Sequence, residues 1–322
     1  MEQLNLSAVK TQVICDSDGN RHIFFGVDNE FVSHALITIM SLIDNAGESL
    51  YQFHIISSEL NDADTTRIKK ILDGTPHGLT YHHVGDELFS LLPTTSLFTK
   101  ATYYRLLAPL LLPDADKVLY LDADMVCLNS PEELWTIPTG DNDIALVVSE
   151  SDILKDELVR NAGLIGTSYF NAGMMLIDVA RWNRSHISEK AFDLLNNREI
   201  RLKYLDQDAL NIVLEGSVRY VSRRFNYIEM LAHNEHGYRT DVPSDTCILH
   251  YAGADKPWHE WNQQQVCKYY RNIYRRSPLA EHPLYLPKNH SQAKRMYKTM
   301  FRNRQLLRAV YWRIRYYQMR YL

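Results

Sequence analysis

The sequence predicts an α/β protein in which helices cover both faces of a sheet. Short apolar runs with the length of strands alternate along the chain with segments of helical pattern. This alternation favours parallel strands, because a parallel pair needs a crossover connection that is usually a helix. The chain has 322 residues, of which 45% are hydrophobic, and this composition is normal for a globular protein with a sizeable core.

The expected elements follow one another in regular order. Strands are expected at 22–27, 51–57, 79–84, 118–121, 143–149, 168–178 and 247–251, and helices at 31–43, 61–72, 99–108, 179–196 and 206–214. Residues 151–161 are expected to form either a helix or a lid segment. Asn61 is the expected N-cap of the second helix. Residues 1–21 are polar and weakly patterned, so we expect a polar leader ahead of the first strand.

Charge is distributed unevenly along the chain. The net charge is −4, but residues 288–322 hold ten Lys or Arg and no Asp or Glu. The other 287 residues hold 25 basic and 39 acidic side chains. An acidic body with a basic tail, in which aromatic residues alternate with the cations, predicts two surfaces with different partners.

Two carboxylates that follow the expected strand at 118–121 are candidate metal ligands. Asp122 and Asp124 are separated by Ala123, and alternate side chains of an extended chain point the same way. Two like charges in one place are unfavourable unless a cation lies between them. A polar turn after a strand is the simpler explanation for this short motif taken alone.

Polar residues at other strand ends extend this candidate site. They occur at 28–30, 171–173 and 250–258, and ligands of open α/β sheets bind at the carboxyl ends of the strands. His250 would add one nitrogen to the two carboxylates, a set that suits Mn²⁺ or Mg²⁺ better than Zn²⁺. A diphosphate could fill the remaining positions on the metal. The chain has no Walker-type loop and no Gly-x-Gly-x-x-Gly motif, which disfavours ATPases and dehydrogenases.

Six stretches in this order resemble the retaining glycosyltransferases of family eight. They are Phe-Gly-Val-Asp-Asn at 25–29, Tyr-Tyr-Arg-Leu at 103–106, Tyr-Leu-Asp-Ala-Asp at 120–124, Phe-Asn-Ala-Gly at 170–173, Leu-Asp-Gln-Asp at 205–208 and the run at 250–258. The chain is most similar to the bacterial lipopolysaccharide core glucosyl- and galactosyltransferases. The resemblance implies a GT-A-type, Rossmann-like mixed sheet flanked by helices. The catalytic domain would then comprise residues 22–281, and a basic amphipathic helical tail would comprise residues 282–322.

The resemblance also implies roles for individual residues. The ligands of Mn²⁺ or Mg²⁺ would be Asp122, Asp124 and His250. The UDP part of a UDP-sugar donor would be bound by Asp28, Asn29, Phe31 stacking on the uracil, Gly253 and Lys256. The residues at the donor sugar, where catalysis occurs, would be Arg105, Asn171, Asp206 and Gln207. Asp208 is left outside this set as a charge that suits the start of a helix.

The expected reaction moves glucose or galactose from a UDP-sugar to the growing lipopolysaccharide core with retention of configuration. Retention requires either attack from the leaving-group face or a covalent intermediate, for which Asp206 is a better nucleophile than Gln207. We favour attack from the leaving-group face, with a diphosphate oxygen taking the acceptor proton. A transferase of the same fold with a protein or glycogen-type acceptor is the alternative, and a catalytically silent UDP-sugar-binding module is a third possibility that the intact motifs disfavour.

The basic aromatic segment at 288–322 predicts the location of the protein. Cations with interfacial aromatic residues suit an anionic membrane surface, and the acidic body argues against nucleic acid as a partner. A tail helix that simply packs on the body is the alternative. The start of the chain lacks the pattern of a signal peptide, and no apolar run approaches the roughly 18 residues of a membrane span. We therefore expect a cytoplasmic protein, peripheral on the inner face of the bacterial inner membrane.

Overall fold

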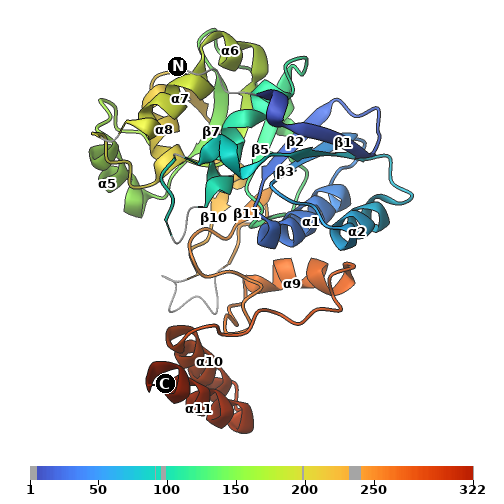
Figure 1. Ribbon diagram of the computed structural model, residues 1–322, viewed down its shortest axis with the longest axis vertical. Helices are drawn as coiled ribbons and strands as arrows, with labels where there is room; N and C mark the ends of the chain where they lie inside the picture. The colour runs from blue at the N-terminus through green and yellow to red at the C-terminus, as the bar shows by residue number, and fades with distance from the viewer. Residues whose placement is uncertain (1–5, 91, 96–98, 198, 232–240, 322) are drawn as a thin grey trace. The chain divides into compact units, whose positions relative to one another are not determined.

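The computed structural model describes residues 6–90, 92–95, 99–197, 199–231 and 241–321 (Figure 1). The chain forms two compact units. The first comprises Met1–Ile228 and Asp245–His250, and the second comprises Glu229–Ser244 and Tyr251–Leu322. Within the described ranges, each helix is too short or too polar to cross a lipid bilayer.

A mixed sheet forms the centre of the first unit. In the described part of the chain it has eight strands in the order β1-β4-β3-β2-β5-β8-β7-β9. The strands are β1 (Lys10–Cys15), β2 (Arg21–Gly26), β3 (Tyr51–Ser57), β4 (Gly78–His83), β5 (Lys117–Leu121), β7 (Ala145–Ser149), β8 (Phe170–Asp178) and β9 (Val218–Tyr220). A second sheet joins β10 (Tyr227–Ile228), β11 (Ile248–His250) and β6 (Met125–Cys127). The mixed sheet flanked by helices that the family resemblance implies is confirmed.

The purely parallel sheet that the alternating pattern favours is wrong. Strands β4, β3, β2 and β5 are parallel, but β8 runs antiparallel to both β5 and β7. Eight of the nine residues of β8 are buried. A strand buried on both faces has the same continuous apolar pattern in either direction, so its sequence does not reveal which way it runs.

The expected polar leader at 1–21 also differs from the structure. Lys10–Cys15 form β1, which pairs antiparallel with β4. All six residues of β1 are exposed or half-buried, because the strand lies at the edge of the sheet. An edge strand of this kind lacks the buried alternation by which a strand is predicted from sequence.

The helices of the first unit flank the sheet. They are α1 (Asn29–Asp44), α2 (Asp62–Leu72), α3 (Ala108–Leu111), α4 (Glu133–Thr136), α5 (Asp152–Ala162), α6 (Val179–Arg184), α7 (Ile187–Asn196) and α8 (Leu205–Val213), with the 3₁₀ helices η1 (Leu6–Ala8), η2 (Asp86–Phe89), η3 (Lys100–Leu107) and η4 (Arg223–Phe225). Helices α1 and α2 lie on one side of the strands, and α6 and α7 lie on the other (Figure 1). Asn61 caps α2 as predicted. The single helix predicted at 179–196 is divided at His186, whose φ of 52° interrupts it.

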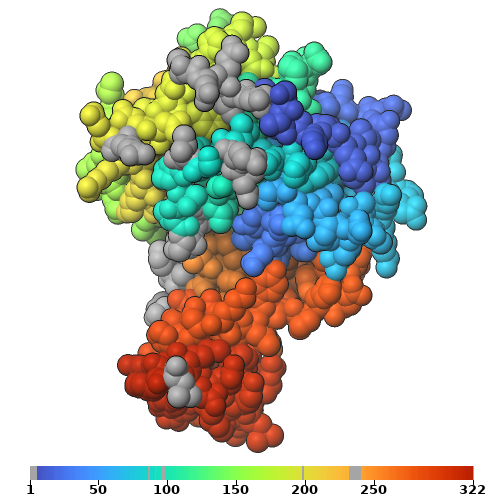
Figure 2. All heavy atoms as spheres, viewed as in Figure 1, coloured from blue at the N-terminus to red at the C-terminus, as the bar shows by residue number. Residues whose placement is uncertain are grey.

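The second unit contains α9 (Cys267–Arg276), α10 (His290–Arg302) and α11 (Leu306–Tyr321). Helices α10 and α11 form a hairpin around an apolar cluster, to which Trp261 also contributes. Figure 2 shows the outer surface of this hairpin in dark red. The main buried members of the cluster are Trp261, Ala293, Met296, Met300, Ala309, Trp312 and Tyr316. The tail is thus helical, as predicted, but it consists of two helices. The predicted limits at 22–281 and 282–322 stay a prediction.

A chain of hydrogen-bonded histidines crosses the parallel part of the sheet. His22 Nδ1 lies 3.1 Å from His54 Nε2, and His54 Nδ1 lies 3.0 Å from His82 Nε2. The last contact in this row of side chains is made by Thr11 of β1, whose Oγ1 lies 3.1 Å from His82 Nδ1. Burial lowers the pKa of His54 well below its usual value, and burial lowers the pKa of His82 to about 4. The folded protein therefore keeps these rings neutral at a pH where the unfolded chain already binds protons.

We predict that acid destabilises the fold through this chain of histidines. A group with a lowered folded-state pKa contributes its full stability above the unfolded value of about 6.5, and that stability is lost as the pH falls toward the folded value. For His82 the loss is about 3 kcal/mol near pH 4. Urea denaturation at pH 7.5 and pH 4.5 should show a smaller acid-induced loss in His82→Gln than in the wild type. The exposed His290→Gln is the control, and an unchanged loss in His82→Gln would contradict the prediction.

Candidate active site

Asp122 follows β5 directly, and three contacts, one of its backbone and two of its side chain, fix its position. Its backbone N–H donates to the carbonyl of Gly173 in β8 at 2.8 Å. Its Oδ1 accepts hydrogen bonds from Tyr120 Oη and Arg105 Nη2, each at 2.9 Å. Because Oδ1 is held in this way, Oδ2 is the oxygen that faces His250, whose Nε2 lies 3.9 Å away.

The second sheet brings Asp124 and His250 to the same place. His250 of β11 pairs with Met125 of β6, the residue that follows Asp124. His250 Nε2 then lies 3.2 Å from Asp124 Oδ1. The hydroxyl of Thr38 in α1 lies 2.8 Å from the Met125 carbonyl and 3.1 Å from the Ala123 carbonyl, which fixes the turn that carries Asp124. One ligand atom from each of Asp122, Asp124 and His250 lies within 4.8 Å of the others, so the predicted metal ligands do come together.

The chemistry and the shape of this cluster fit a divalent cation. Two carboxylates and one imidazole, with His250 only 3% exposed, form a hard, negatively charged ligand set of the kind that Mn²⁺ or Mg²⁺ prefers. Gly173 keeps the space beside them open. A Cβ atom at position 173 would lie 2.6 Å from His250 Cε1 and 2.8 Å from both Asp122 Oδ2 and Asn171 Oδ1. A glycine in a strand interior often marks such a close approach.

The guanidinium of Arg105 in η3 joins the cluster to the predicted sugar-binding residues. Besides Asp122, it contacts Asp206 Oδ2 through Nε at 2.9 Å and donates from Nη1 to the Ala172 carbonyl at 2.8 Å. It also lies 4.8 Å from the centre of the Tyr120 ring. Burial opposes the charge of Arg105, but Asp122 and Asp206 outweigh this effect and raise its pKa above the usual value. Arg105 therefore stays charged.

Asp206 and Gln207 lie in the first turn of α8, where Asp206 contacts Arg105. The preceding Leu205 has a φ of 39°, a strained backbone conformation of the kind that is found at functional sites. Asp206 is 2% exposed, and its Oδ1 accepts a hydrogen bond from Thr102 at 3.1 Å. Burial raises the pKa of Asp206 to about 6, although Arg105 offsets part of the rise. Gln207 Oε1 accepts the N–H of Ala172 at 3.0 Å.

Asn171 lies in β8, next to Ala172 and Gly173. Its Oδ1 accepts the N–H of Gly173 at 3.0 Å, and its Nδ2 donates to Glu150 Oε2 at 3.0 Å. The four predicted catalytic residues are therefore close neighbours around one short piece of β8. Asp208 accepts hydrogen bonds from Tyr169 and from the backbone of Tyr204, which is a structural role.

The predicted nucleotide-binding residues of the first unit lie at the start of α1. Asp28 caps this helix, since its Oδ1 accepts the N–H of Phe31 at 3.1 Å. Asn29 is exposed and donates to Glu59 at 2.7 Å, and the half-buried Phe31 ring lies edge-on to His34. This group follows β2, which is parallel to β5. It therefore lies at the same sheet edge as Asp122, the edge at which ligands of such sheets bind.

Gly253 and Lys256 belong to the second unit. Gly253 has a φ of +84°, a conformation that favours glycine, and the nearest atom to an added Cβ would be Met230 Cε at 3.7 Å. Lys256 Nζ donates to the Tyr251 carbonyl at 2.8 Å. Their predicted contact with the diphosphate stays a prediction.

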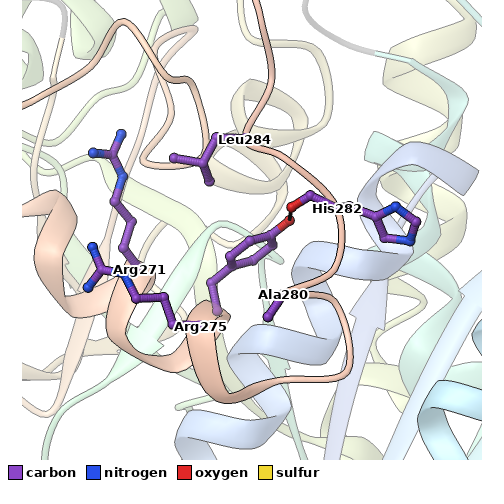
Figure 3. Close-up of a pocket in the computed structure, with 6 residues that line it drawn as sticks. Arg271, Arg275, Ala280, His282 and Leu284 are labelled. Atoms are coloured by element: carbon purple, nitrogen blue, oxygen red, sulfur yellow. Dashed lines mark hydrogen bonds between the residues drawn. The ribbon is translucent and has the colours of Figure 1, made fainter.

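A cavity of about 260 Å³ lies at α9 and is distinct from all these residues. It is lined by Arg271, Tyr274, Arg275, Ala280, His282 and Leu284. In Figure 3 the guanidinium groups of Arg271 and Arg275 lie on one side, and the His282 ring points away from them. The guanidinium of Arg271 also donates hydrogen bonds to the carbonyls of Pro257, His259 and Asn262. These charges do not converge on one ligand.

Sequence reasoning missed several residues of the site. Tyr120 could have been found, because it lies two residues before Asp122 on the same side of β5 and so reaches the same carboxylate. No comparable spacing in the sequence points to Thr38, Glu150 or Asn226. They act from separate elements, and the folded chain alone brings them near Asp124, Asn171 and His250.

We predict that Gly173→Ala weakens the binding of Mn²⁺ by at least about tenfold, because the new methyl group would displace His250 and Asp122. Titration of the full chain with Mn²⁺, followed by electron paramagnetic resonance, measures this affinity. Gly166→Ala is the matched control, since its added Cβ would meet Glu215 at an ordinary 3.4 Å. Equal affinities of the two variants would contradict the prediction.

Comparison with known proteins places this site in a family. The family model described as glycosyl transferase family 8 matches residues 22–262, and the model of the C-terminal region of the same family matches residues 265–319. The lipopolysaccharide 1,3-galactosyltransferase of Salmonella typhimurium is 30% identical over 315 residues, which cover 95% of this chain and 93% of the relative. The lipopolysaccharide 1,2-glucosyltransferase of Escherichia coli is 30% identical over 318 residues, with the same coverage.

A solved structure confirms the predicted GT-A-type fold. The crystal structure of galactosyltransferase LgtC in complex with donor and acceptor sugar analogues superposes with a TM-score of 0.68 at 24% identity, over 83% of this chain and 98% of LgtC. The family model covers most of the chain, and the two relatives match it over nearly its whole length. The chain therefore belongs to glycosyl transferase family 8, and it is a hexosyltransferase.

Proposed function

We propose that the enzyme transfers glucose or galactose from a UDP-sugar to the growing lipopolysaccharide core, with retention of configuration. The observation that carries this proposal is the cluster of Asp122, Asp124 and His250 at the sheet edge, in a chain whose relatives are lipopolysaccharide galactosyl- and glucosyltransferases. Such a cluster suits a reaction in which a nucleoside diphosphate leaves, because a bound divalent cation neutralises the negative charge that develops on the diphosphate.

The metal ligands in this proposal are Asp122, Asp124 and His250, and the metal is Mn²⁺ or Mg²⁺. When bound, the cation stabilises the negative charge of the departing diphosphate. Asp28, Asn29 and Phe31 bind the uridine. Gly253 and Lys256 bind the diphosphate, with Lys256 as a point charge on the leaving group.

The contacts of Asp206 favour attack from the leaving-group face over a covalent intermediate. One carboxylate oxygen is paired with Arg105, the other accepts from Thr102, and the side chain is almost fully buried. A nucleophile needs an oxygen with a clear path to the sugar. Asp206 and Gln207 are better suited to orient the donor sugar and to stabilise its positive character in the transition state. A diphosphate oxygen then takes the proton of the acceptor hydroxyl as the new glycosidic bond forms and the old one breaks.

The surface of α11 supports a membrane-bound acceptor. Ala309, Trp312 and Tyr316 on one side of the helix are buried against α10. The opposite side is an outer stripe of exposed apolar and aromatic residues: Leu306, Leu307, Val310, Tyr311, Ile314, Tyr317 and Tyr321. At 3.6 residues per turn, Arg308 and Arg315 border this stripe on one side, and Arg313 and Arg320 border it on the other.

An exposed apolar stripe between two rows of cations is the pattern of a helix lying in an anionic membrane surface. Each cation near such a surface contributes about 1 kcal/mol. We propose that the protein is peripheral on the cytoplasmic face of the bacterial inner membrane, where α11 brings the active site to a lipid-linked acceptor.

We predict that transfer depends on the metal and on both aspartates. The purified chain, lipopolysaccharide core acceptor and either UDP-glucose or UDP-galactose should release UDP when Mn²⁺ or Mg²⁺ is present, and chelation should stop it. Asp122→Asn and Asp124→Asn should each lower the rate by at least about a hundredfold, since one missing charge-stabilising group costs about 3–4 kcal/mol in the transition state. Asp141→Asn, an exposed aspartate, is the control. Full activity without metal would refute the proposed mechanism, and transfer only to a protein or glycogen-type acceptor would refute the proposed acceptor.

We predict that the outer stripe is needed for membrane binding but not for chemistry. The double variant Leu307→Glu, Ile314→Glu should bind vesicles containing phosphatidylglycerol at least about tenfold more weakly, because it places charge on the apolar stripe. Its hydrolysis of the UDP-sugar in solution should be unchanged. Ile153→Glu is the matched control, since Ile153 of α5 is also exposed. Vesicle binding as strong as that of the control would rule out the stripe as the membrane contact.

A further inference from the structure

A chain of hydrogen bonds between side chains lies behind the candidate metal site. Glu150 Oε2 accepts from Asn171 Nδ2, and Asn171 Oδ1 accepts from Asn226 Nδ2, each at 3.0 Å. Asn226 Oδ1 lies 3.0 Å from His250 Nδ1. Asn226, which immediately precedes β10, is 1% exposed, so each of its polar atoms needs a partner within the protein.

The direction of these hydrogen bonds is fixed at both ends of Asn171. A backbone N–H can only donate, so the side-chain atom that accepts from the Gly173 N–H must be the oxygen of Asn171. The amide nitrogen of Asn171 then faces the carboxylate of Glu150, which accepts. Both contacts agree on the orientation of this amide group.

The orientation of Asn171 also determines which atoms donate and which accept in the contacts of Asn226 and His250. Because the atom of Asn171 that faces Asn226 is an oxygen, the facing atom of Asn226 must be the amide nitrogen. The oxygen of Asn226 therefore faces His250, and His250 Nδ1 must carry the proton. In the neutral ring, Nε2 then has a lone pair, and it faces Asp124 Oδ1 at 3.2 Å and Asp122 Oδ2 at 3.9 Å. A lone pair among carboxylate oxygens is a metal-ligating arrangement.

We propose that Asn226 is the positioning residue of the metal site, which fixes the tautomer of His250 and couples it to Asn171 in the donor-sugar pocket. The inference rests on the proposed metal role of His250. A hydrogen bond from the second ring nitrogen to a protein oxygen orients a histidine ligand and raises its basicity. Asn171 Oδ1 accepts from both Gly173 and Asn226, so a shift of Asn171 on the sugar also shifts His250 on the metal.

The tautomer can be measured directly in the wild-type chain. We expect long-range ¹H–¹⁵N spectra of ¹⁵N-histidine-labelled, metal-free protein, recorded at a pH where the ring is neutral, to show a proton on Nδ1 of His250 and none on Nε2. The signals of His250 are those that disappear in His250→Gln. A neutral His250 with its proton on Nε2 would overturn the inference, whatever the variants do.

Two substitutions separate the two contacts of Asn226. Asn226→Asp keeps an oxygen that accepts from His250 Nδ1 but places a second acceptor against Asn171 Oδ1. We expect its Mn²⁺ affinity to stay within about threefold of wild type, while its kcat for transfer falls by about tenfold or more. Asn226→Leu loses both contacts, and we expect its Mn²⁺ affinity to fall by about tenfold or more. Asn45→Leu, which removes an amide bonded to Ser41 and Cys127, is the control and should bind Mn²⁺ like the wild type.

The outcomes distinguish this inference from the proposed function. If wild type and Asn226→Leu bind Mn²⁺ equally well, the role of Asn226 is wrong and the metal site stands. If both Asn226 variants lose Mn²⁺ affinity equally, Asn226 supports the fold rather than the tautomer, and the inference is wrong. If the wild type does not bind Mn²⁺, the metal role assigned to His250 fails, and this inference fails with it.

Discussion

Two ion pairs and one hydrogen bond of a single buried guanidinium hold four separate parts of the chain together. Arg105 of η3 contacts Asp122 after β5, Asp206 at the start of α8 and the carbonyl of Ala172 in β8. A buried charge is tolerated only when it is paired, and removing one partner of such a pair typically costs about 3–5 kcal/mol. The same three contacts that keep Arg105 in the interior therefore also set the spacing between the metal ligands and the donor-sugar pocket.

The charges around Arg105 do not cancel. Three carboxylates, those of Asp122, Asp124 and Asp206, lie around the one guanidinium of Arg105, so the acidic groups outnumber the basic group by two. A divalent cation would offset this excess. A divalent cation thus suits the excess of acidic groups at the site, whereas the sheet on which the site is built is an ordinary apolar framework.

The sequence predicted those parts of the fold and site that leave a local pattern. Asp122 and His250 were found because polar residues at the ends of buried strands stand out from the apolar runs before them. The direction of β8 was not predictable, since a strand buried on both faces has the same pattern either way. Edge strand β1 was missed because it lacks a buried face. Asn226 was missed for another reason: its role comes from the folded neighbours His250 and Asn171, and no spacing in the sequence records them.

Helix α11 is apolar on two opposite sides, one against α10 and the other forming the outer stripe. Without α10 it would have apolar residues nearly all round, with its cations confined to two narrow bands. Such a helix has no stable state in water by itself, since neither apolar side could be turned away from solvent. A truncation between the two helices would therefore leave the apolar side of α10, with Ala293, Met296 and Met300, exposed to solvent, whereas the removal of both helices would not.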